Sequence, residues 1–235
     1  MNNKRLSIII PCYNEEGTVG LVVERLLNVP FSGWDPEIIV INDGSTDGTA
    51  TVLEKFATKV RVINLVQNSG KGSAVKAGIT AATGDYAIIQ DADLECTPEE
   101  IPLLLVPLQG ISSDAKVVVM GSRELNREGD SGKGKFFPRI GSLSITKLIN
   151  FLYGSSLTDA LMGYKLFPRA TFDYFTVGRF EAEMIFITRV LKEGYKIVEV
   201  PVSYDPRAED AGKKIRYRDG IKIILRILRF WATGR

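Results

Sequence analysis

Short apolar runs rich in isoleucine and valine alternate along the first half of the chain with segments of helical spacing. The runs lie at Leu6–Ile10, Ile38–Ile41, Val60–Val66, Tyr86–Ile89 and Val117–Met120. The helix-like segments between them are Thr18–Leu27, Thr46–Ala57, Lys71–Ala82 and Pro98–Leu108. Apolar strands that alternate with helices are typical of parallel sheets covered on both faces. The pattern therefore predicts an α/β fold with a mostly parallel sheet between two layers of helices.

Polar residues follow each predicted strand. The five stretches are PCYNE (11–15), NDGS (42–45), QNSGKG (67–72), DAD (91–93) and GSR (121–123). In parallel α/β sheets, ligands bind outside the carboxyl ends of the strands. We therefore expect these five ends to form one polar rim and to contain the functional site.

The second half of the chain alternates less regularly. A glycine-rich, charged stretch from Glu124 to Arg139 predicts a mobile surface loop. Helices are expected at about Ile140–Leu152 and Phe180–Lys192, and a strand at about Lys196–Tyr204.

The last segment, Asp219–Trp231, predicts an amphipathic helix. Its apolar positions are Ile221, Ile223, Ile224, Leu225, Ile227, Leu228, Phe230 and Trp231, and Lys222, Arg226 and Arg229 form a basic stripe. A helix that docks on the protein core and one that lies in a membrane interface both have such a face. The sequence leaves both interpretations open, including a different partner for each side of the helix.

Composition limits the class of protein. The 235 residues are 45% hydrophobic and 25% charged with a net charge of +2, which indicates a globular chain rather than a general nucleic-acid binder. The two cysteines, Cys12 and Cys96, lack C-x-x-C spacing, so a disulfide framework or zinc site is not expected. The N-terminal apolar run is too short for a secretory signal, and no apolar run reaches about 18 residues. We expect a cytoplasmic location.

Three acids stand at alternate positions in IIQDADLE (88–95). In an extended segment, Asp91, Asp93 and Glu95 would share one face, where like charges repel unless a cation or a proton compensates. A strand-to-helix turn is the alternative, because Thr97 and the following Pro-Glu-Glu have the cap, proline and acids of a helix start. The acids alone leave a divalent-metal site and a turn open.

Residues at two other predicted strand ends are candidates for binding a nucleotide. Asp43 in NDGSTDGT lies where a turn and helix cap are expected, but an ionised carboxylate would also accept hydrogen bonds from a base or ribose. Lys71 in GKGS does not belong to a phosphate-binding loop of the G-x-x-x-x-G-K-[ST] type, because Leu65 replaces the first glycine and Gly72 follows the lysine. Lys71 can still reach a nucleotide.

The ordered set PCYNEE, NDGSTDGT, NSGKGSAVKAG and DADLECTPEE resembles the signatures of family 2 inverting glycosyltransferases of the GT-A fold. The later GSR, LTDALMGYKLF, FEAEM and EVPVSYDPR resemble the branch of dolichyl-phosphate mannose synthases and polyprenyl-phosphate glycosyltransferases. The resemblance covers about Leu6 to Arg207. It implies a metal-dependent hexosyltransferase that uses Mg²⁺ or Mn²⁺.

The resemblance also implies roles for matching positions. Pro11, Tyr13, Glu15 and Asp43 would line the nucleotide pocket, with Lys71 nearby. Asp91 and Asp93 would meet both the metal and the sugar nucleotide, and Glu95 stands where the synthases often have glutamine, also near the metal. Asn42 replaces the first acid of the common DDGS, so Asp43 is taken as the functional residue.

The acceptor divides the possible reactions. A sugar hydroxyl would need a carboxylate base, for which Glu183 is the candidate. A lipid phosphate is already anionic and would need cations instead. The candidate cations are Arg123, Arg139, Arg207, Lys213 and Lys214, whereas Arg127, Lys133 and Lys135 are expected to be solvated surface charges. Asp159 is expected either to cap a helix or to orient an arginine.

Together these features predict a GT-A catalytic domain over residues 1–205, followed by a basic amphipathic segment over 206–235. The expected reaction is inverting transfer of a hexose from a GDP-mannose or UDP-glucose type donor to a polyprenyl or dolichyl phosphate at the cytoplasmic face of a membrane. The alternatives are transfer to a sugar hydroxyl with Glu183 as base, and a non-catalytic module that binds sugar nucleotide or lipid.

Overall fold

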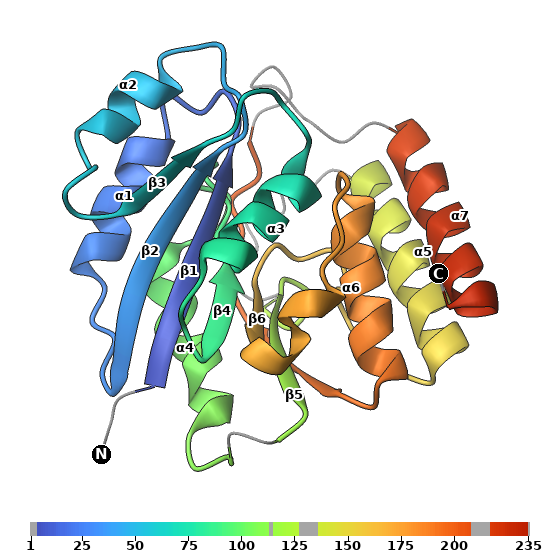
Figure 1. Ribbon diagram of the computed structural model, residues 1–235. Coiled ribbons are helices and arrows are strands. Elements are labelled where there is room, and N and C mark those ends of the chain that lie inside the picture. The colour runs from blue at the N-terminus through green and yellow to red at the C-terminus, as the bar shows by residue number, and fades with distance from the viewer. Residues whose placement is uncertain (1–3, 113–114, 127–135, 208–216, 235) are drawn as a thin grey trace.

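The computed structural model of the protein describes residues 4–112, 115–126, 136–207 and 217–234, without the side chains of 136–139 and 217–219. Within these residues, seven strands form one mixed sheet in the order β3-β2-β1-β4-β6-β5-β7 (Figure 1). The strands are β1 Lys4–Cys12, β2 Trp34–Asn42, β3 Arg61–Asn64, β4 Tyr86–Ile89, β5 Val117–Ser122, β6 Lys165–Pro168 and β7 Lys196–Pro201.

Strand directions follow the predicted pattern with one exception. β1 pairs in parallel with β2 and β4, β2 with β3, and β5 with β7. β6, which the sequence analysis did not predict, is antiparallel to both of its neighbours, β4 and β5. Because two antiparallel pairings restore the direction, β5 runs parallel to β4. The carboxyl ends of β1 to β5 therefore lie at one edge of the sheet, as expected.

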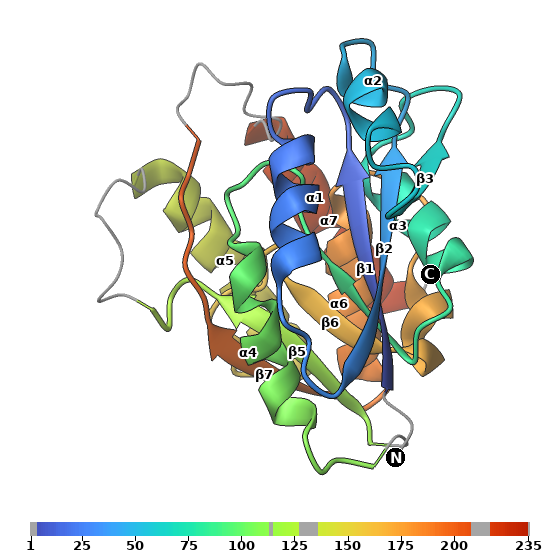
Figure 2. The same cartoon turned by 90° about the vertical axis from the view of Figure 1, so that its left-hand side faces the viewer.

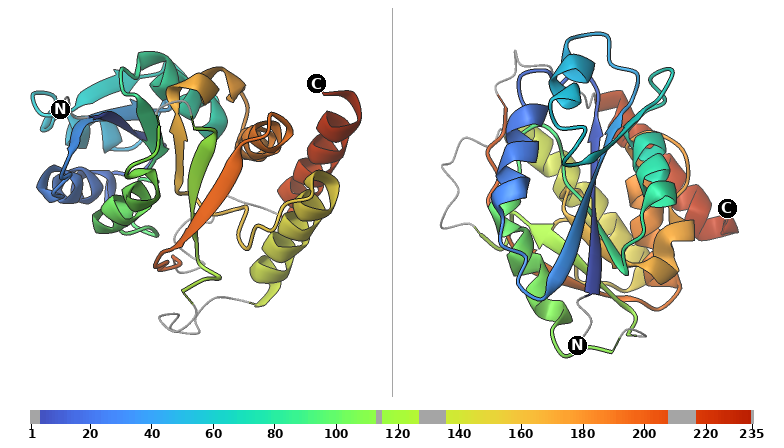
Figure 3. Two further views of the ribbon diagram at one scale, coloured as in Figure 1. Left: turned by 90° about the horizontal axis from the view of Figure 1, so that it is seen from below. Right: turned by 60° about the vertical axis from the view of Figure 1, so that its left-hand side comes forward.

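Helices cover both faces of the sheet (Figures 2 and 3). On one face lie α1 Val19–Asn28, α2 Thr49–Glu54 and α4 Ile101–Leu105, and on the other α3 Lys71–Ala81, α5 Phe136–Tyr153, α6 Glu181–Lys192 and α7 Tyr217–Thr233. Short 3₁₀-helices at Pro98–Glu100 (η1) and Val106–Leu108 (η2) flank α4, and a longer one, Arg169–Tyr174 (η4), follows β6. The predicted α/β architecture with helices on both faces is confirmed.

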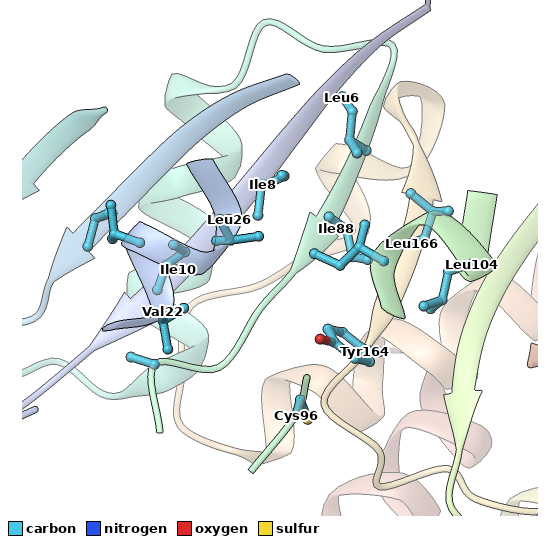
Figure 4. Packing of buried hydrophobic residues seen from close by; sticks show 14 of the residues in the cluster. Leu6, Ile8, Ile10, Val22, Leu26, Ile88, Cys96, Leu104, Tyr164 and Leu166 are labelled. Carbon is cyan, nitrogen blue, oxygen red and sulfur yellow. The ribbon is translucent and has the colours of Figure 1, made fainter. Parts of the chain in front are cut away.

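Side-chain alternation along β1 divides the core into two layers. Leu6, Ile8 and Ile10 pack with Val22 and Leu26 of α1 on one face (Figure 4). Ile9 faces the other way, into the layer formed with α3, α5, α6 and α7. A strand buried on both faces must be apolar at consecutive positions, which explains the unbroken run that predicted β1.

Several predicted helix boundaries differ from the structure, most of them by one residue. α5 begins at Phe136, four residues before the predicted start, and α2 covers Thr49–Glu54 rather than Thr46–Ala57. Thr97 precedes η1 but makes no side-chain cap to it, because its hydroxyl pairs with that of Ser203 at 3.1 Å. The predicted threonine cap is therefore wrong.

The helix α7 uses its two apolar sides differently. Ile223, Ile227 and Phe230 are buried in the core, whereas Leu225 and Trp231 are 62% and 53% exposed. Ile221 and Leu228 are also exposed, so an apolar row faces away from the protein. In the described part of the chain, no helix is both long and apolar enough to cross a membrane.

Candidate functional site

The three acids after β4 do not share one face. β4 ends at Ile89, and the chain then turns, with Leu94 at a φ of 61° and the Glu95 amide donating to Asp93 Oδ1 at 3.1 Å. The predicted extended arrangement is therefore wrong, because side chains alternate only where the strand continues. Among the described residues, no group of three or more acidic, cysteine or histidine side chains is arranged to hold a metal ion.

Glu95 is already engaged by the segment after β7. Its Oε2 accepts a hydrogen bond from the Tyr204 hydroxyl at 2.6 Å, and its Oε1 accepts one from the Arg207 amide at 3.1 Å. Glu95 thus links the segment 202–207 to the turn that carries Asp91 and Asp93.

Asp91 and Asp93 fit a divalent cation better. Burial, and after it the charges of Asp91 and Glu95, raises the pKa of Asp93 to about 7. Such a shift means that negative charge at this position is poorly compensated. Mg²⁺ and Mn²⁺ prefer oxygen ligands, and Mg²⁺ is usually held by one or two carboxylates plus substrate phosphates. The two carboxylates of Asp91 and Asp93 meet that requirement.

A chain of charged side chains runs from Asp91 into the core. Lys71, the first residue of α3, places its Nζ 2.7 Å from Asp91 Oδ1 and 2.8 Å from Glu183 Oε1. The other oxygen of Glu183 lies 2.6 Å from Nζ of Lys165 on β6. Burial alone would raise the pKa of Glu183, but the charges of Lys165 and Lys71 outweigh it and lower that pKa to about 2. Burial likewise opposes the charge on Lys71, yet Asp91 and Glu183 hold its pKa above the ordinary value.

Glycine at position 72 has a packing reason. A Cβ at Gly72 would overlap the Ala182 side chain and the Arg179 carbonyl oxygen at the start of α6. The Lys-Gly order that breaks the phosphate-loop pattern therefore lets α3 approach α6, which brings Lys71 to Glu183.

The residues predicted to line a nucleotide pocket lie at the same edge of the sheet. Pro11 is buried in β1 and Tyr13 follows it, half-buried. Asp43 is 2% exposed, and its two carboxylate oxygens accept the amides of Ser69 and Gly70 at 2.9 and 2.8 Å. Asp43 therefore holds the loop that leads to Lys71, and its contact with a nucleotide stays a prediction.

Glu15 and Arg207 join distant parts of the chain. Arg207 Nη2 donates to Glu15 Oε2 at 2.5 Å, and Arg207 Nε donates to the Asp93 carbonyl oxygen at 3.0 Å. The structure thus brings Arg207 to the acids, and its role toward an acceptor phosphate stays a prediction.

Arg123 is oriented by Asp159. Its Nε and Nη2 donate to the two Asp159 oxygens at 2.6 and 2.8 Å, and the guanidinium lies 4.8 Å from the centre of the Tyr204 ring. Of the two predictions for Asp159, orientation of an arginine is confirmed. Arg139 belongs to α5, but its side chain lies outside the described residues. Also outside them are Arg127, Lys133, Lys135, Lys213 and Lys214.

The sequence analysis missed two residues of this site. Lys165 is fully buried within the apolar run Tyr164–Phe167, and a single lysine in such a run was the available signal. Tyr204 links Arg123 to Glu95 through its ring and hydroxyl, and no spacing rule in the sequence indicates that contact.

Comparison with known families gives a match over most of the chain. The family described as Glycosyl transferase family 2 matches residues 7–175. A dolichyl-phosphate beta-glucosyltransferase from Homo sapiens is 30% identical over 220 residues, which cover 86% of this chain and 67% of the relative. An undecaprenyl-phosphate 4-deoxy-4-formamido-L-arabinose transferase from Pectobacterium carotovorum is 36% identical over 162 residues, covering 66% of this chain and 46% of the relative.

Solved structures share the fold. Glucosyl-3-phosphoglycerate synthase from Mycobacterium tuberculosis, crystallised with Mn²⁺, uridine diphosphate and phosphoglyceric acid, superposes with a TM-score of 0.72 at 22% identity. The match covers 97% of this chain and 78% of that one. The same enzyme crystallised with Mg²⁺ and uridine diphosphate gives a TM-score of 0.73.

Proposed function

Because the chain belongs to glycosyl transferase family 2, we propose that it transfers a hexose from a nucleoside diphosphate sugar to a polyprenyl phosphate, with inversion at the anomeric carbon. The names of its relatives support a dolichyl or undecaprenyl phosphate as acceptor. The glucosyltransferase name of the human relative favours a UDP-glucose type donor over a GDP-mannose type.

The observation that carries the choice of acceptor is the state of Glu183. Both of its carboxylate oxygens are ion-paired with lysines, and its pKa of about 2 makes it a weak proton acceptor. A base works best when its pKa lies near the operating pH, so Glu183 is poorly suited to deprotonate a sugar hydroxyl. A phosphate monoester is already anionic and needs no base. This favours the phosphate acceptor over the hydroxyl alternative.

In the proposed reaction, an oxygen of the lipid phosphate forms a bond to the anomeric carbon while the bond from that carbon to the donor diphosphate breaks. The products are a lipid-phosphate sugar and a nucleoside diphosphate. Arg123 and Arg207, with Arg139, would hold the acceptor phosphate, since the guanidinium fork matches phosphate oxygens. Asp159 fixes the plane of the Arg123 guanidinium in advance, which lowers the cost of orienting the acceptor.

On the donor side, Asp91 and Asp93 would hold Mg²⁺ or Mn²⁺, which when bound neutralises charge on the departing diphosphate. Lys71 lies beside Asp91 and offers a second positive charge to the same group. Pro11, Tyr13, Glu15 and Asp43 would surround the nucleotide at the adjoining strand ends.

The acceptor lipid also requires contact with a membrane. We assign this contact to the exposed apolar row of α7 and its basic neighbours Lys222, Arg226 and Arg229. Such a helix can lie in the membrane interface without crossing it. The protein would then work as a peripheral enzyme on the cytoplasmic face.

Matched acceptors test the reaction. A short polyprenyl phosphate and the polyprenol of the same length differ only in the phosphate, and each is offered with UDP-glucose and metal. We expect sugar transfer to the phosphate alone. Equal or preferred transfer to the polyprenol would contradict the proposed acceptor and favour a hydroxyl reaction.

A further inference from the structure

Lys165 is a fully buried lysine with no role in the reaction as described so far. It lies on β6 with 0% exposure, its Nζ donates to the Met162 carbonyl oxygen, and its charge is balanced by Glu183. Removing a lysine from water is costly, and a buried ion pair rarely stabilises a fold more than apolar side chains of the same volume. Fold stability alone is therefore a weak reason for a lysine here.

The charges alternate along a line that leads to the candidate site. Lys165 contacts Glu183, Glu183 contacts Lys71, and Lys71 contacts Asp91. The exposed fractions of the four side chains rise in that order from 0% through 6% and 17% to 20%. The inner end of the chain is thus sealed in the core, and only the outer end meets the site.

The numbers of acceptors on Glu183 and of donors on Lys71 explain what the Lys165–Glu183 pair does. A carboxylate has two oxygens, and Lys165 occupies one oxygen of Glu183, so Lys71 pairs with the other. An ammonium has three N–H donors, and Lys71 Nζ lies 2.8 Å from one oxygen of Glu183 and 2.7 Å from one oxygen of Asp91. The third donor can then be offered to a diphosphate oxygen beside Asp91.

We propose that Lys165 is a positioning residue, which acts through Glu183 to hold the Lys71 ammonium against Asp91 where the donor diphosphate departs. This inference rests on the proposed function, because it assigns Lys71 to the diphosphate. Without Lys165, both oxygens of Glu183 turn to Lys71 and draw its ammonium away from Asp91. The site then loses a positive charge at the point where negative charge develops.

A double-mutant cycle separates positioning from a structural role. The variants are Lys71→Met, Lys165→Met and the double variant, with kcat and KM measured for the sugar nucleotide and Tm measured for each. Lys76→Met is the matched control, since Lys76 lies on the same helix but pairs with Asp173 at 3.8 Å. We expect Lys165→Met to lower kcat by about 10- to 100-fold with a smaller change in KM. The control keeps wild-type kcat.

The decisive result is the double variant. If Lys165 acts through Lys71, adding Lys165→Met to Lys71→Met leaves kcat unchanged, although Tm still shifts. Wild-type kcat in folded Lys165→Met, or a double variant whose loss is the product of the single losses, would overturn the inference. If Lys165→Met does not fold, Glu183→Gln replaces it in the cycle and is judged by the same criteria.

Failure of the proposed function has a different signature. A wild-type protein that hydrolyses the donor but forms no lipid product contradicts the polyprenyl phosphate acceptor. The same variants are then compared by the kcat of donor hydrolysis, because departure of the diphosphate is common to both reactions. Non-additive loss in that assay supports the positioning role, and unchanged hydrolysis in Lys165→Met overturns it.

Discussion

At the scale of single residues, we predict that Asp93 makes stability depend on pH and on metal. Its pKa in the folded protein is raised from the ordinary 3.8 to about 7, so between these values the folded state binds more protons than the unfolded state. In EDTA, its contribution to the free energy of unfolding therefore falls as pH rises from about 4 to about 7. A divalent cation favours the ionised carboxylate and should reverse this loss.

Urea unfolding at pH 5 and pH 8, with EDTA or Mn²⁺, measures this effect. Wild-type protein should gain more stability from Mn²⁺ at pH 8 than at pH 5. Asp93→Asn should show a weaker pH dependence in EDTA and a smaller gain from Mn²⁺. Equal gains from Mn²⁺ in wild-type and Asp93→Asn protein would argue against a cation at Asp93.

Gly163 gives a second prediction at this scale. A Cβ at Gly163 would overlap Asp91 Oδ2, so Gly163→Ala must displace the carboxylate that meets Lys71. We expect kcat to fall by about 10-fold or more, because a small misplacement of a catalytic group is costly. Gly141→Ala is the control, since nothing lies within 4 Å of its added Cβ. Wild-type kcat in Gly163→Ala would show that the position of Asp91 does not limit the reaction.

The sequence predicted the acidic and arginine side of the site better than its lysine side. Asp91, Asp93 and Arg123 follow strands whose carboxyl ends were predicted to meet at one edge, so local pattern and topology were enough to bring them together. Lys165 on β6 pairs with Glu183 on α6, 18 positions later in the sequence, and only the folded chain brings them together. The three acids do not keep the predicted common face because the backbone turns after Ile89, and side chains alternate between faces only in an extended strand.

At the scale of elements, the strands with long apolar runs could be predicted and β6 could not. β6 has four residues, one of them a lysine, and its place between β4 and β5 depends on antiparallel pairing with residues about 45 to 80 positions away. Yet β6 carries Lys165, which pairs with Glu183, and follows Gly163, which lies close to the Asp91 carboxylate.

Substitutions on the two sides of α7 should affect different properties, namely stability on the buried side and membrane binding on the exposed side. Ile227 is fully buried, so Ile227→Ala should lower the free energy of unfolding by about 2 to 5 kcal/mol. Leu225 is 62% exposed, so Leu225→Gln should change stability little but weaken binding to vesicles that contain anionic lipid. Chemical unfolding and vesicle sedimentation measure the two effects. Unchanged vesicle binding in Leu225→Gln with Trp231→Gln would exclude the outer row of α7 as the membrane contact.

At the scale of the whole molecule, the candidate site joins the two halves of the chain. The first half supplies the acids and Lys71, and the second half supplies Arg123, Glu183, Lys165 and Arg207. The predicted family resemblance is confirmed by the match over residues 7–175. The division at 205 stays a prediction, although Ile223 and Ile227 of α7 pack in the same buried cluster as α6.

The most direct test of the central claim is transfer of radiolabelled sugar from a panel of UDP- and GDP-sugars to a short polyprenyl phosphate. The assay is run with Mg²⁺ or Mn²⁺, with EDTA, and with Asp91→Ala and Asp93→Ala protein. We predict that label enters the organic phase from one donor, only with metal, and is lost in both variants. Label that stays in the aqueous phase with every donor, or transfer that persists in both variants, would contradict the account.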